Sequence, residues 1–214
     1  MVTNSFNSKV TVSMRHIKRN LFNRGQYMSH QVPRGFGKGG MCQYITKPRV
    51  HLQMIRLLID NRNFFQSIIV DNKQTVEKEL KVWKHINAHP FSVEFINKEK
   101  QFGLVATEKI LKGSNIGPYL GEYIPEKEAR KRNTSYGVKL ELPQKAGYPK
   151  WPLFIIDAEN YGTGMRYMNH DKANPNVELE VESIMLNELW FPIIIARTIR
   201  DIKQGEELCL NYWT

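Results

Sequence analysis

The chain is poor in cysteine and has no long apolar run. Its 214 residues include two cysteines, Cys42 and Cys209, which lie far apart in the sequence. This excludes a disulfide framework and a cysteine-rich zinc module. No apolar run approaches the roughly 20 residues that a membrane-spanning helix requires, so we expect no membrane partner. An apolar content of 41% is instead typical of a globular protein with a hydrophobic core.

Acidic residues are missing from the first 50 positions. This segment carries nine lysine and arginine residues, and thus +9 of the formal net charge of +10. Residues 51–214 hold 22 basic and 21 acidic residues, a net charge of +1. Three interpretations of this basic arm stay open: a contact with nucleic acid or another anionic surface, a targeting segment, or a solvated tail.

Two local patterns suggest binding sites that their surroundings argue against. The glycine-rich run from Val32 to Met41 resembles a phosphate-binding loop only superficially, because its spacing does not match and no strand precedes it. It is better interpreted as a flexible loop. His85 and His89 have a helical spacing that would suit a metal ion, but no third ligand is evident nearby and Pro90 ends the helix. We therefore predict a histidine pair without function and no metal site.

The apolar pattern divides the chain into three parts. Residues 1–50 form the basic, partly flexible arm, and residues 51–90 have apolar positions three and four residues apart, which is typical of helices. Asn61-Arg62-Asn63 interrupts this pattern, which predicts two or three helices that end before Pro90. Residues 91–214 follow as a compact domain.

Short β-like runs dominate this last part. The predicted strands are residues 103–107, 119–124, 136–142, 153–156, 177–184 and 190–196. A short helix is predicted over residues 125–132, because Pro125 suits a first helical turn and its acidic residues precede its basic ones. The predicted fold class is α+β: a mostly β domain preceded by a helical region.

Four separated motifs carry the chemistry of the β-rich part. They are Lys100-Gln101-Phe102-Gly103-Leu104-Val105-Ala106; Tyr119-Leu120-Gly121-Glu122; Arg166-Tyr167-Met168-Asn169-His170 followed by Asn174-Pro175-Asn176; and Ile202-Lys203-Gln204-Gly205-Glu206-Glu207-Leu208 followed by Asn211-Tyr212. Any one motif is weak. All four in this order make residues 95–213 resemble the SET-domain protein lysine methyltransferases.

The resemblance implies a SET domain built of several small sheets with a threaded C-terminal segment. It also implies S-adenosylmethionine as cofactor and a lysine in a histone or histone-like protein as substrate. The nearest likeness is to the small bacterial SET proteins of the chlamydial type, which lack zinc modules. That likeness implies a secreted effector that acts in a host nucleus, and an intracellular enzyme is the alternative.

Site residues follow from the resemblance, motif by motif. Tyr212 matches the catalytic tyrosine and Tyr119 a second tyrosine of the lysine channel. Leu210 stands where the family often has an aromatic residue that limits the number of methyl groups, and Leu179 is placed in the same substrate channel. The matches for cofactor binding are Phe102, Gly103, Tyr136, Arg166, Asn169 and His170.

These residue types suit methyl transfer to an amine. The amine must be neutral, aligned and desolvated, so positioning dominates the barrier. A phenol is neutral at pH 7, offers an acceptor oxygen and adds an aromatic wall beside a positive charge. An asparagine offers both a donor and an acceptor to the amino-acid part of the cofactor.

The chain departs from the family at three places. Gln101 replaces the first glycine of a Gly-aromatic-Gly run, and Asp171-Lys172 replaces a Ser-Cys pair after Asn-His. Because the cysteine of that pair is absent, we expect no counterpart of the zinc-bearing C-terminal cap that completes the lysine channel in some relatives. We therefore expect the N-terminal helices, or a partner protomer in a homodimer, to close the channel.

Two other functions stay open. One is methylation of a non-histone protein, and the other is a degenerate SET domain that binds nucleic acid or protein. The basic arm would repel a basic substrate, unless nucleic acid bridges them or acidic residues line the channel rim. Candidates for such a rim are Glu122, Glu178, Glu180 and Glu182.

Overall fold

A computed structural model describes residues 42–45, 48–67, 90–142, 144, 146–147, 150–186 and 189–212. Most of the predicted basic arm, its glycine-rich run, and the pair His85 and His89 lie outside the described residues. Within the described residues, no helix is both long enough and apolar enough to cross a membrane. The division into three parts stays a prediction.

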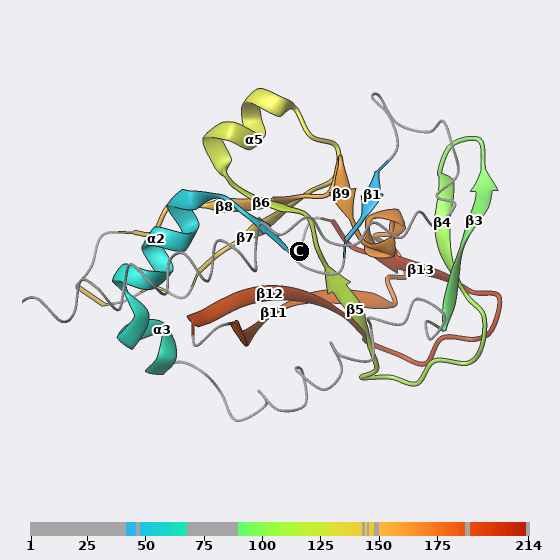
Figure 1. The fold of residues 1–214 in the computed structure, drawn as a ribbon. Coiled ribbons are helices and arrows are strands. Elements are labelled where there is room, and N and C mark those ends of the chain that lie inside the picture. The colour runs from blue at the N-terminus through green and yellow to red at the C-terminus, as the bar shows by residue number, and fades with distance from the viewer. Residues whose placement is uncertain are drawn as a thin grey trace, which may run out of the picture.

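Helices lie on one side of the molecule and on its top edge (Figure 1). α2 (Leu52–Asp60) begins where the His51 side chain accepts a hydrogen bond from the Gln53 amide, and it ends at Asn61. α3 (Arg62–Ser67) follows at once. The predicted helices, and the interruption at Asn61, are therefore confirmed for this part of the chain.

The predicted helix after Pro125 is also present. α5 (Glu126–Arg132) starts with Pro125 as its N-cap and has acidic residues in the first turn and basic residues in the last. This order matches the helix dipole. Asn133 ends the helix in a left-handed conformation, with φ 52°, which asparagine tolerates better than most residues.

Strands dominate the described residues, which confirms the predicted mostly β fold. A two-stranded sheet pairs β1 (Gln43–Tyr44) with β9 (Tyr161–Gly162). A four-stranded sheet has the order β2 (Arg49–Val50), β6 (Glu122–Pro125), β8 (Phe154–Asp157) and β7 (Gly137–Leu140). The largest sheet has the order β3 (Phe91–Asn97), β4 (Gln101–Ala106), β13 (Glu207–Leu210), β11 (Val177–Leu186), β12 (Leu189–Thr198) and β5 (Asn115–Tyr119), and β10 (Asn169–His170) pairs with β13.

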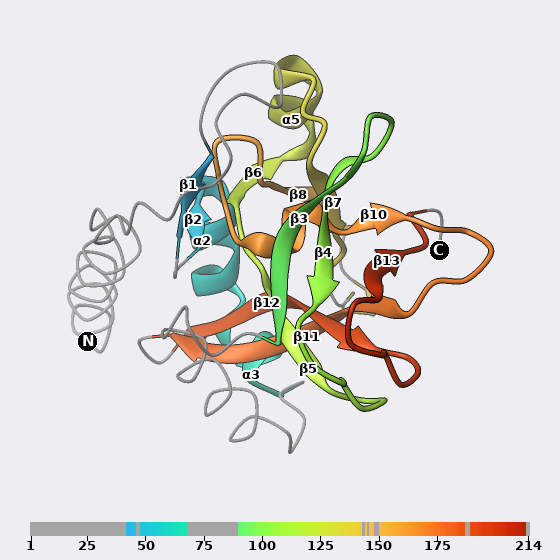
Figure 2. The same cartoon turned by 90° about the vertical axis from the view of Figure 1, so that its right-hand side faces the viewer.

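The final strand lies inside the largest sheet, not at its edge. β13 pairs antiparallel with β4 and parallel with both β10 and β11. Segments that are far apart in the sequence therefore meet around it (Figure 2). This insertion is the predicted threading of the C-terminal segment.

One predicted strand is in fact two. The sequence predicts a single strand over 119–124, but β5 ends at Tyr119 and β6 begins at Glu122 in a different sheet. Gly121 lies in the corner between them, where a Cβ atom would collide with the backbone of Asp157. Only glycine allows the chain to turn this closely past β8.

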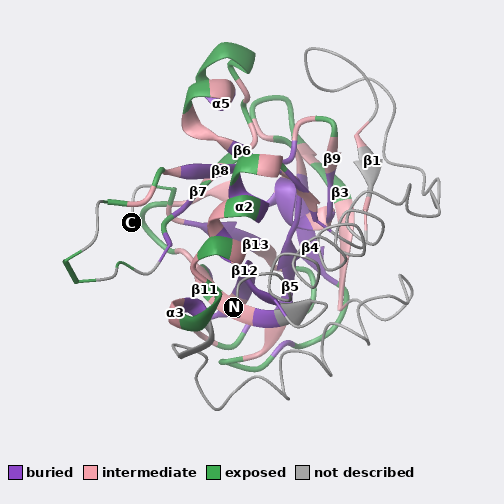
Figure 3. Cartoon of the chain, turned by 60° about the vertical axis from the view of Figure 1, so that its left-hand side comes forward, coloured by how far each residue is buried: buried purple, intermediate pink, exposed green. Residues whose placement is uncertain are grey.

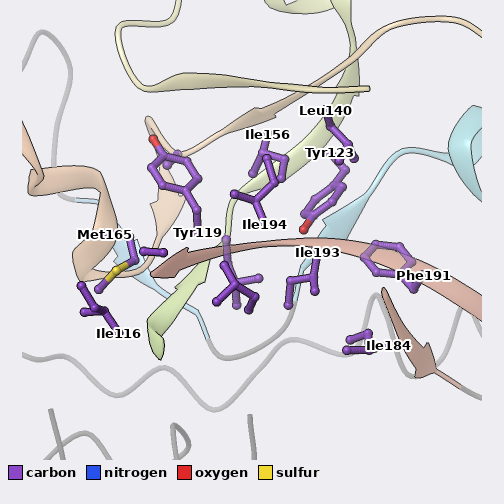
Figure 4. Packing of buried hydrophobic residues seen from close by; sticks show 14 of the residues in the cluster. Ile116, Tyr119, Tyr123, Leu140, Ile156, Met165, Ile184, Phe191, Ile193 and Ile194 are labelled. Carbon is purple, nitrogen blue, oxygen red and sulfur yellow. The ribbon is translucent and has the colours of Figure 1, made fainter. Parts of the chain in front are cut away.

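The core runs along β12 and holds the helices at one end. Phe65 of α3 stacks on Trp190 near the start of β12, with ring centroids 4.7 Å apart. The buried residues form a band through the middle of the molecule (Figure 3). Figure 4 shows Tyr119 and Met165 towards one end of this cluster and Phe191 and Ile184 towards the other. α2, α3 and the sheets thus share one hydrophobic core, whereas Ala129 of α5 packs with Ile124 and Ile155 in a second, small cluster.

Candidate active site

The polar motifs of the sequence converge on the strand pair β10–β13. Asn169 lies opposite Cys209 and His170 opposite Leu210 in a parallel register. On the other side of β13, Glu207 lies opposite Val105 of β4. The first, third and fourth motifs therefore meet at one place, as Figure 2 shows.

Asn176 clamps the last strand in this position. Its side-chain oxygen accepts from the Cys209 amide at 2.8 Å, and its Nδ2 donates to the Glu207 carbonyl at 2.8 Å. Its own amide donates to the Cys209 carbonyl at 3.1 Å. The side chain is fully buried. The second asparagine of Asn-Pro-Asn thus builds the site and does not face a ligand.

The side chain of Asn169 is fixed by two acceptors. Its Nδ2 donates to the Phe102 carbonyl at 3.1 Å and to Glu207 Oε1 at 2.8 Å. The other oxygen of Glu207 pairs with the Lys100 ammonium at 2.8 Å, and this hydrogen bond raises the pKa of Lys100. Both amide hydrogens of Asn169 are thereby used, so its carbonyl oxygen is the group that this arrangement directs to a ligand.

Gly103 leaves no space between these groups. A Cβ atom there would lie 2.7 Å from Glu207 Oε1, 2.8 Å from a side-chain carbon of Ile96 and 3.0 Å from Asn169 Nδ2. Gln101, two residues earlier, has φ 61°. The left-handed conformation that glycine adopts freely is therefore kept at Gln101 without the glycine.

Tyr212 is held by two hydrogen bonds from opposite ends of the residue. Its hydroxyl donates to the Met168 carbonyl at 2.6 Å, and its amide donates to Nδ1 of His170 at 3.1 Å. The imidazole and phenol rings have centroids 5.1 Å apart. Loss of solvation around the hydroxyl raises the pKa of Tyr212, so the phenol is neutral at pH 7.

The second predicted tyrosine, Tyr119, is buried. The hydroxyl of Tyr119 donates to the Tyr136 carbonyl at 2.9 Å. Burial raises the pKa of Tyr119, the Arg166 guanidinium opposes this rise, and Tyr212 adds to it. The structure thus brings the two predicted catalytic tyrosines close enough to interact electrostatically.

Arg166 and Tyr136 form a wall of this region. The guanidinium of Arg166 lies 3.8 Å from the centroid of the Tyr136 ring and donates to the Glu159 carbonyl at 3.0 Å. Cys42, which lies outside all four motifs, interacts electrostatically with the same guanidinium and favours its charged form, which raises the pKa of Arg166. The buried Nε of Arg166 has no hydrogen-bond partner within the part of the chain that the structure describes.

The two predicted channel residues flank the site. Leu210 is buried next to β10 and β11, where it lies opposite both His170 and Val177. Leu179 is half-buried two residues after Val177 and packs against the main core. Because alternate residues of a strand share a face, Leu179 continues the surface that Val177 begins.

Most of the predicted acidic rim is already paired with arginine. Glu122 forms an ion pair with Arg132 at 2.8 Å. Glu180 and Glu182 both pair with Arg197, at 2.7 and 3.4 Å. These three carboxylates stabilise the fold locally and do not supply uncompensated charge to a substrate.

Several residues of the site escaped prediction. Glu207 and Lys100 are in the motifs, but their sequence gives no sign that they hold Asn169. No sequence pattern indicates a role for Cys42, because its contact with the Ala158 carbonyl joins residues 116 positions apart. Within the described residues, no three His, Cys, Asp or Glu side chains gather in a way that could hold a metal ion.

Comparison with known proteins identifies one family. The model of the SET domain matches residues 101–213. A histone-lysine N-methyltransferase of Cryptococcus neoformans var. grubii, named as H3 lysine-9 specific, is 28% identical over 55% of this chain and 8% of its own length. SUV39H2 of Xenopus tropicalis is 31% identical over 52% of this chain and 27% of its own length.

A third relative is named for a different lysine. It is the H3 lysine-36 specific histone-lysine N-methyltransferase of Schizosaccharomyces pombe, 34% identical over 55% of this chain and 14% of its own length. The matched stretches thus span less than a third of each of these three relatives.

Proposed function

Because the chain belongs to the SET domain family, we propose that it is a protein lysine N-methyltransferase that uses S-adenosylmethionine. One observation carries this proposal. Asn169 and His170 of β10 pair with Cys209 and Leu210 of β13. The predicted cofactor residues are therefore on one strand, and Tyr212 follows shortly after the strand that pairs with it. Residues that hold a cofactor can then align it directly against a catalytic residue.

The residues present fit the amino-acid part of S-adenosylmethionine. The Asn169 carbonyl oxygen, directed outward by Phe102 and Glu207, would accept from the ammonium group of the cofactor. The close packing at Gly103 keeps that oxygen in place. When bound, the cofactor supplies an electrophilic methyl group on a sulfonium sulfur.

Tyr212 positions the amine and is not a base. Its hydroxyl proton is committed to the Met168 carbonyl, so its oxygen keeps lone pairs that could accept from the substrate amine. Its raised pKa keeps the phenol neutral. The lysine must therefore lose its proton to water before its nitrogen can accept the methyl group that the bound cofactor would supply. Tyr119 and Leu210 wall the channel for the lysine stem.

The substrate class is a histone or histone-like protein. Two of the relatives carry names that specify lysines 9 and 36 of histone H3. These names support a histone lysine and do not choose between the two positions. A non-histone substrate is the alternative, because three carboxylates of the expected acidic rim are neutralised by arginine.

A transfer assay separates these possibilities. The full chain is incubated with cofactor labelled in the methyl group, with histones and with a cell lysate, and cofactor binding is measured by calorimetry. We expect Tyr212→Phe to bind cofactor normally and to transfer methyl groups about 100-fold more slowly. Labelling of lysate proteins without histones would favour the alternative. Absence of both transfer and cofactor binding would overturn the proposal and favour a degenerate binding module.

α3 lies far from the predicted lysine channel. α3 contacts Trp190 near the start of β12. Leu210 lies opposite Val177, and Val177 pairs with Thr198 at the other end of β12. Eight residues of strand separate the two places, or roughly 26 Å. We propose that a partner protomer of a homodimer closes the channel instead, and light scattering at assay concentrations tests this.

Three further parts of the proposal concern the setting of the enzyme. The basic arm contacts nucleic acid beside the substrate, the enzyme acts on chromatin, and it is a bacterial effector that reaches a host nucleus. Removal of residues 1–41 should weaken activity on nucleosomes, and reduce its salt dependence, without a change on free histones. A fluorescent fusion that stays outside the nucleus of a host cell would contradict the effector role.

A further inference from the structure

His170 makes a contact that cofactor binding does not require. Its Nδ1 accepts a hydrogen bond from the Tyr212 amide at 3.1 Å, and its ring lies against the Tyr212 ring. Tyr212 follows the end of β13, and the residue is 55% exposed. A residue this exposed is held in place mainly by specific bonds, so each of them matters for its position.

This contact depends on the protonation state of the imidazole. A neutral imidazole has one nitrogen that donates and one that accepts, whereas the charged form only donates. Nδ1 of His170 can therefore accept from Tyr212 only while the ring is neutral, with its proton on Nε2. Protonation would place two donors face to face and would break the bond.

We propose that the His170 side chain is a positioning residue for Tyr212, and that methyl transfer requires His170 to be neutral. This inference rests on the proposed methyltransferase function. The backbone of His170 remains part of the strand pair with Leu210, whichever side chain it carries. The role proposed for the imidazole is thus separable from the pairing of β10 with β13.

The ionisable groups around His170 have other partners. Asp171, the next residue, accepts from the amides of Ala173 and Asn174, both at 3.0 Å. Glu207 on β13 is paired with Lys100 and bonded to Asn169. The nearby Cys209 thiol is neutral at pH 7, because burial raises its pKa to about 11.

Three substitutions distinguish positioning from general structural support. Asparagine places its Oδ1 where histidine has Nδ1, so His170→Asn can accept from the Tyr212 amide at any pH. His170→Gln carries its amide one bond further out, and His170→Ala has no acceptor. Above pH 8, we expect His170→Asn to retain a higher kcat than the other two variants, because it keeps an acceptor for the Tyr212 amide. The other two variants should lose about 100-fold in kcat with little change in cofactor affinity.

The pH profile gives the second expected result. Transfer by the unchanged protein should fall towards acid pH because the substrate lysine is protonated, and then more steeply once His170 is protonated. In His170→Asn, the rate should still fall because the substrate lysine is protonated, but the additional fall caused by protonation of His170 should be absent. Equal kcat for the asparagine and alanine variants, or an unchanged acid limb in His170→Asn, would overturn the proposal.

An NMR measurement tests the contact without any assay of activity. Hydrogen exchange of the Tyr212 amide is followed between pH 5 and pH 8 in the full chain. Protection should be lost on acidification in the unchanged protein, persist in His170→Asn and be absent in His170→Ala. If this pattern appears while no methyl transfer is detected, the proposed function fails and the positioning contact stands. Equal protection of the Tyr212 amide in the unchanged protein and in both His170 variants would refute the contact itself.

Discussion

The carboxylate of Glu207 accepts a hydrogen bond from the side-chain amide of Asn169 at 2.8 Å. The same carboxylate is anchored by the Lys100 ammonium at 2.8 Å, and only 17% of its side chain is exposed. Together with the Phe102 carbonyl, Glu207 thus decides which way the amide of Asn169 points. The orientation of the predicted cofactor ligand is set by a residue that would never touch the cofactor.

Glu207→Gln should therefore weaken cofactor binding more than catalysis. A glutamine can turn its own amide towards Asn169, and it loses the charge that Lys100 holds. Because hydrogen bonds to charged groups contribute about 1.5–3 kcal/mol, we expect cofactor affinity to fall by at least tenfold. kcat at saturating cofactor should change little. Titration calorimetry measures the affinity, and Glu108→Gln, at an exposed turn position, is the matched control.

Gly103→Ala tests how tightly the same site is packed. The new methyl group would meet Glu207 Oε1 at 2.7 Å and Asn169 Nδ2 at 3.0 Å. Overpacking of this kind costs about 1–3 kcal/mol, and here it also displaces the two groups that orient the cofactor. We expect lower thermal stability and no measurable cofactor binding. Gly164→Ala, whose nearest neighbour would be 3.4 Å away, should keep both; equal effects would show that Gly103 has no special role.

Gln101→Gly should stabilise the protein. Gln101 has φ 61°, a conformation that costs an L-residue about 1–2 kcal/mol. Glycine removes this strain. Its greater freedom in the unfolded chain, however, costs about 0.5–1 kcal/mol of stability. The net gain of up to about 1.5 kcal/mol corresponds to a rise of up to roughly 3–6 °C in Tm. Gln204→Gly, in a turn without positive φ, should not raise Tm, and a lower Tm for Gln101→Gly would refute the strain.

Elements with a local cause could be predicted from the sequence. α2 and α5 follow from apolar spacing, a cap and a proline. β11 begins with apolar residues that alternate with glutamates, β12 is a long apolar run, and the two pair in a hairpin. β10 and β13 were not predicted as strands, although their residues belong to the recognised motifs. A strand of two residues has no periodicity, and the central place of β13 depends on partners in β4 and β11, which no local pattern encodes.

The same distinction applies to the site. Asn169, His170 and Tyr212 were named from their motifs, and the structure places them together. Glu207 was overlooked because adjacent glutamates usually indicate a solvated surface, and its role arises only when β4 and β13 meet. The break after Tyr119 was likewise missed, since the need for Gly121 comes from the backbone of Asp157 in another strand.

Leu210→Tyr should lower the number of methyl groups added to one lysine. Leu210 is buried beside His170 and Val177, in the place where the family often has an aromatic residue. A larger side chain there leaves less room for a lysine that already carries a methyl group. Mass spectrometry of the methylated substrate measures this, and Leu111→Tyr, at a position that is 59% exposed, is the control. An unchanged product distribution would remove Leu210 from the channel.

Cys209 makes the protein less stable in alkali. Burial raises the pKa of its thiol to about 11, whereas an unfolded cysteine titrates near 8.5. The unfolded chain therefore loses this proton first, so the free energy of unfolding should fall as pH rises from about 8.5 to about 11. Cys209→Ala should flatten this part of the stability curve, measured by urea unfolding at several pH values. Because the thiolate is the reactive form, iodoacetamide should also label Cys209 at pH 8 only after urea has unfolded the chain, and labelling of the folded chain at that pH would contradict the raised pKa.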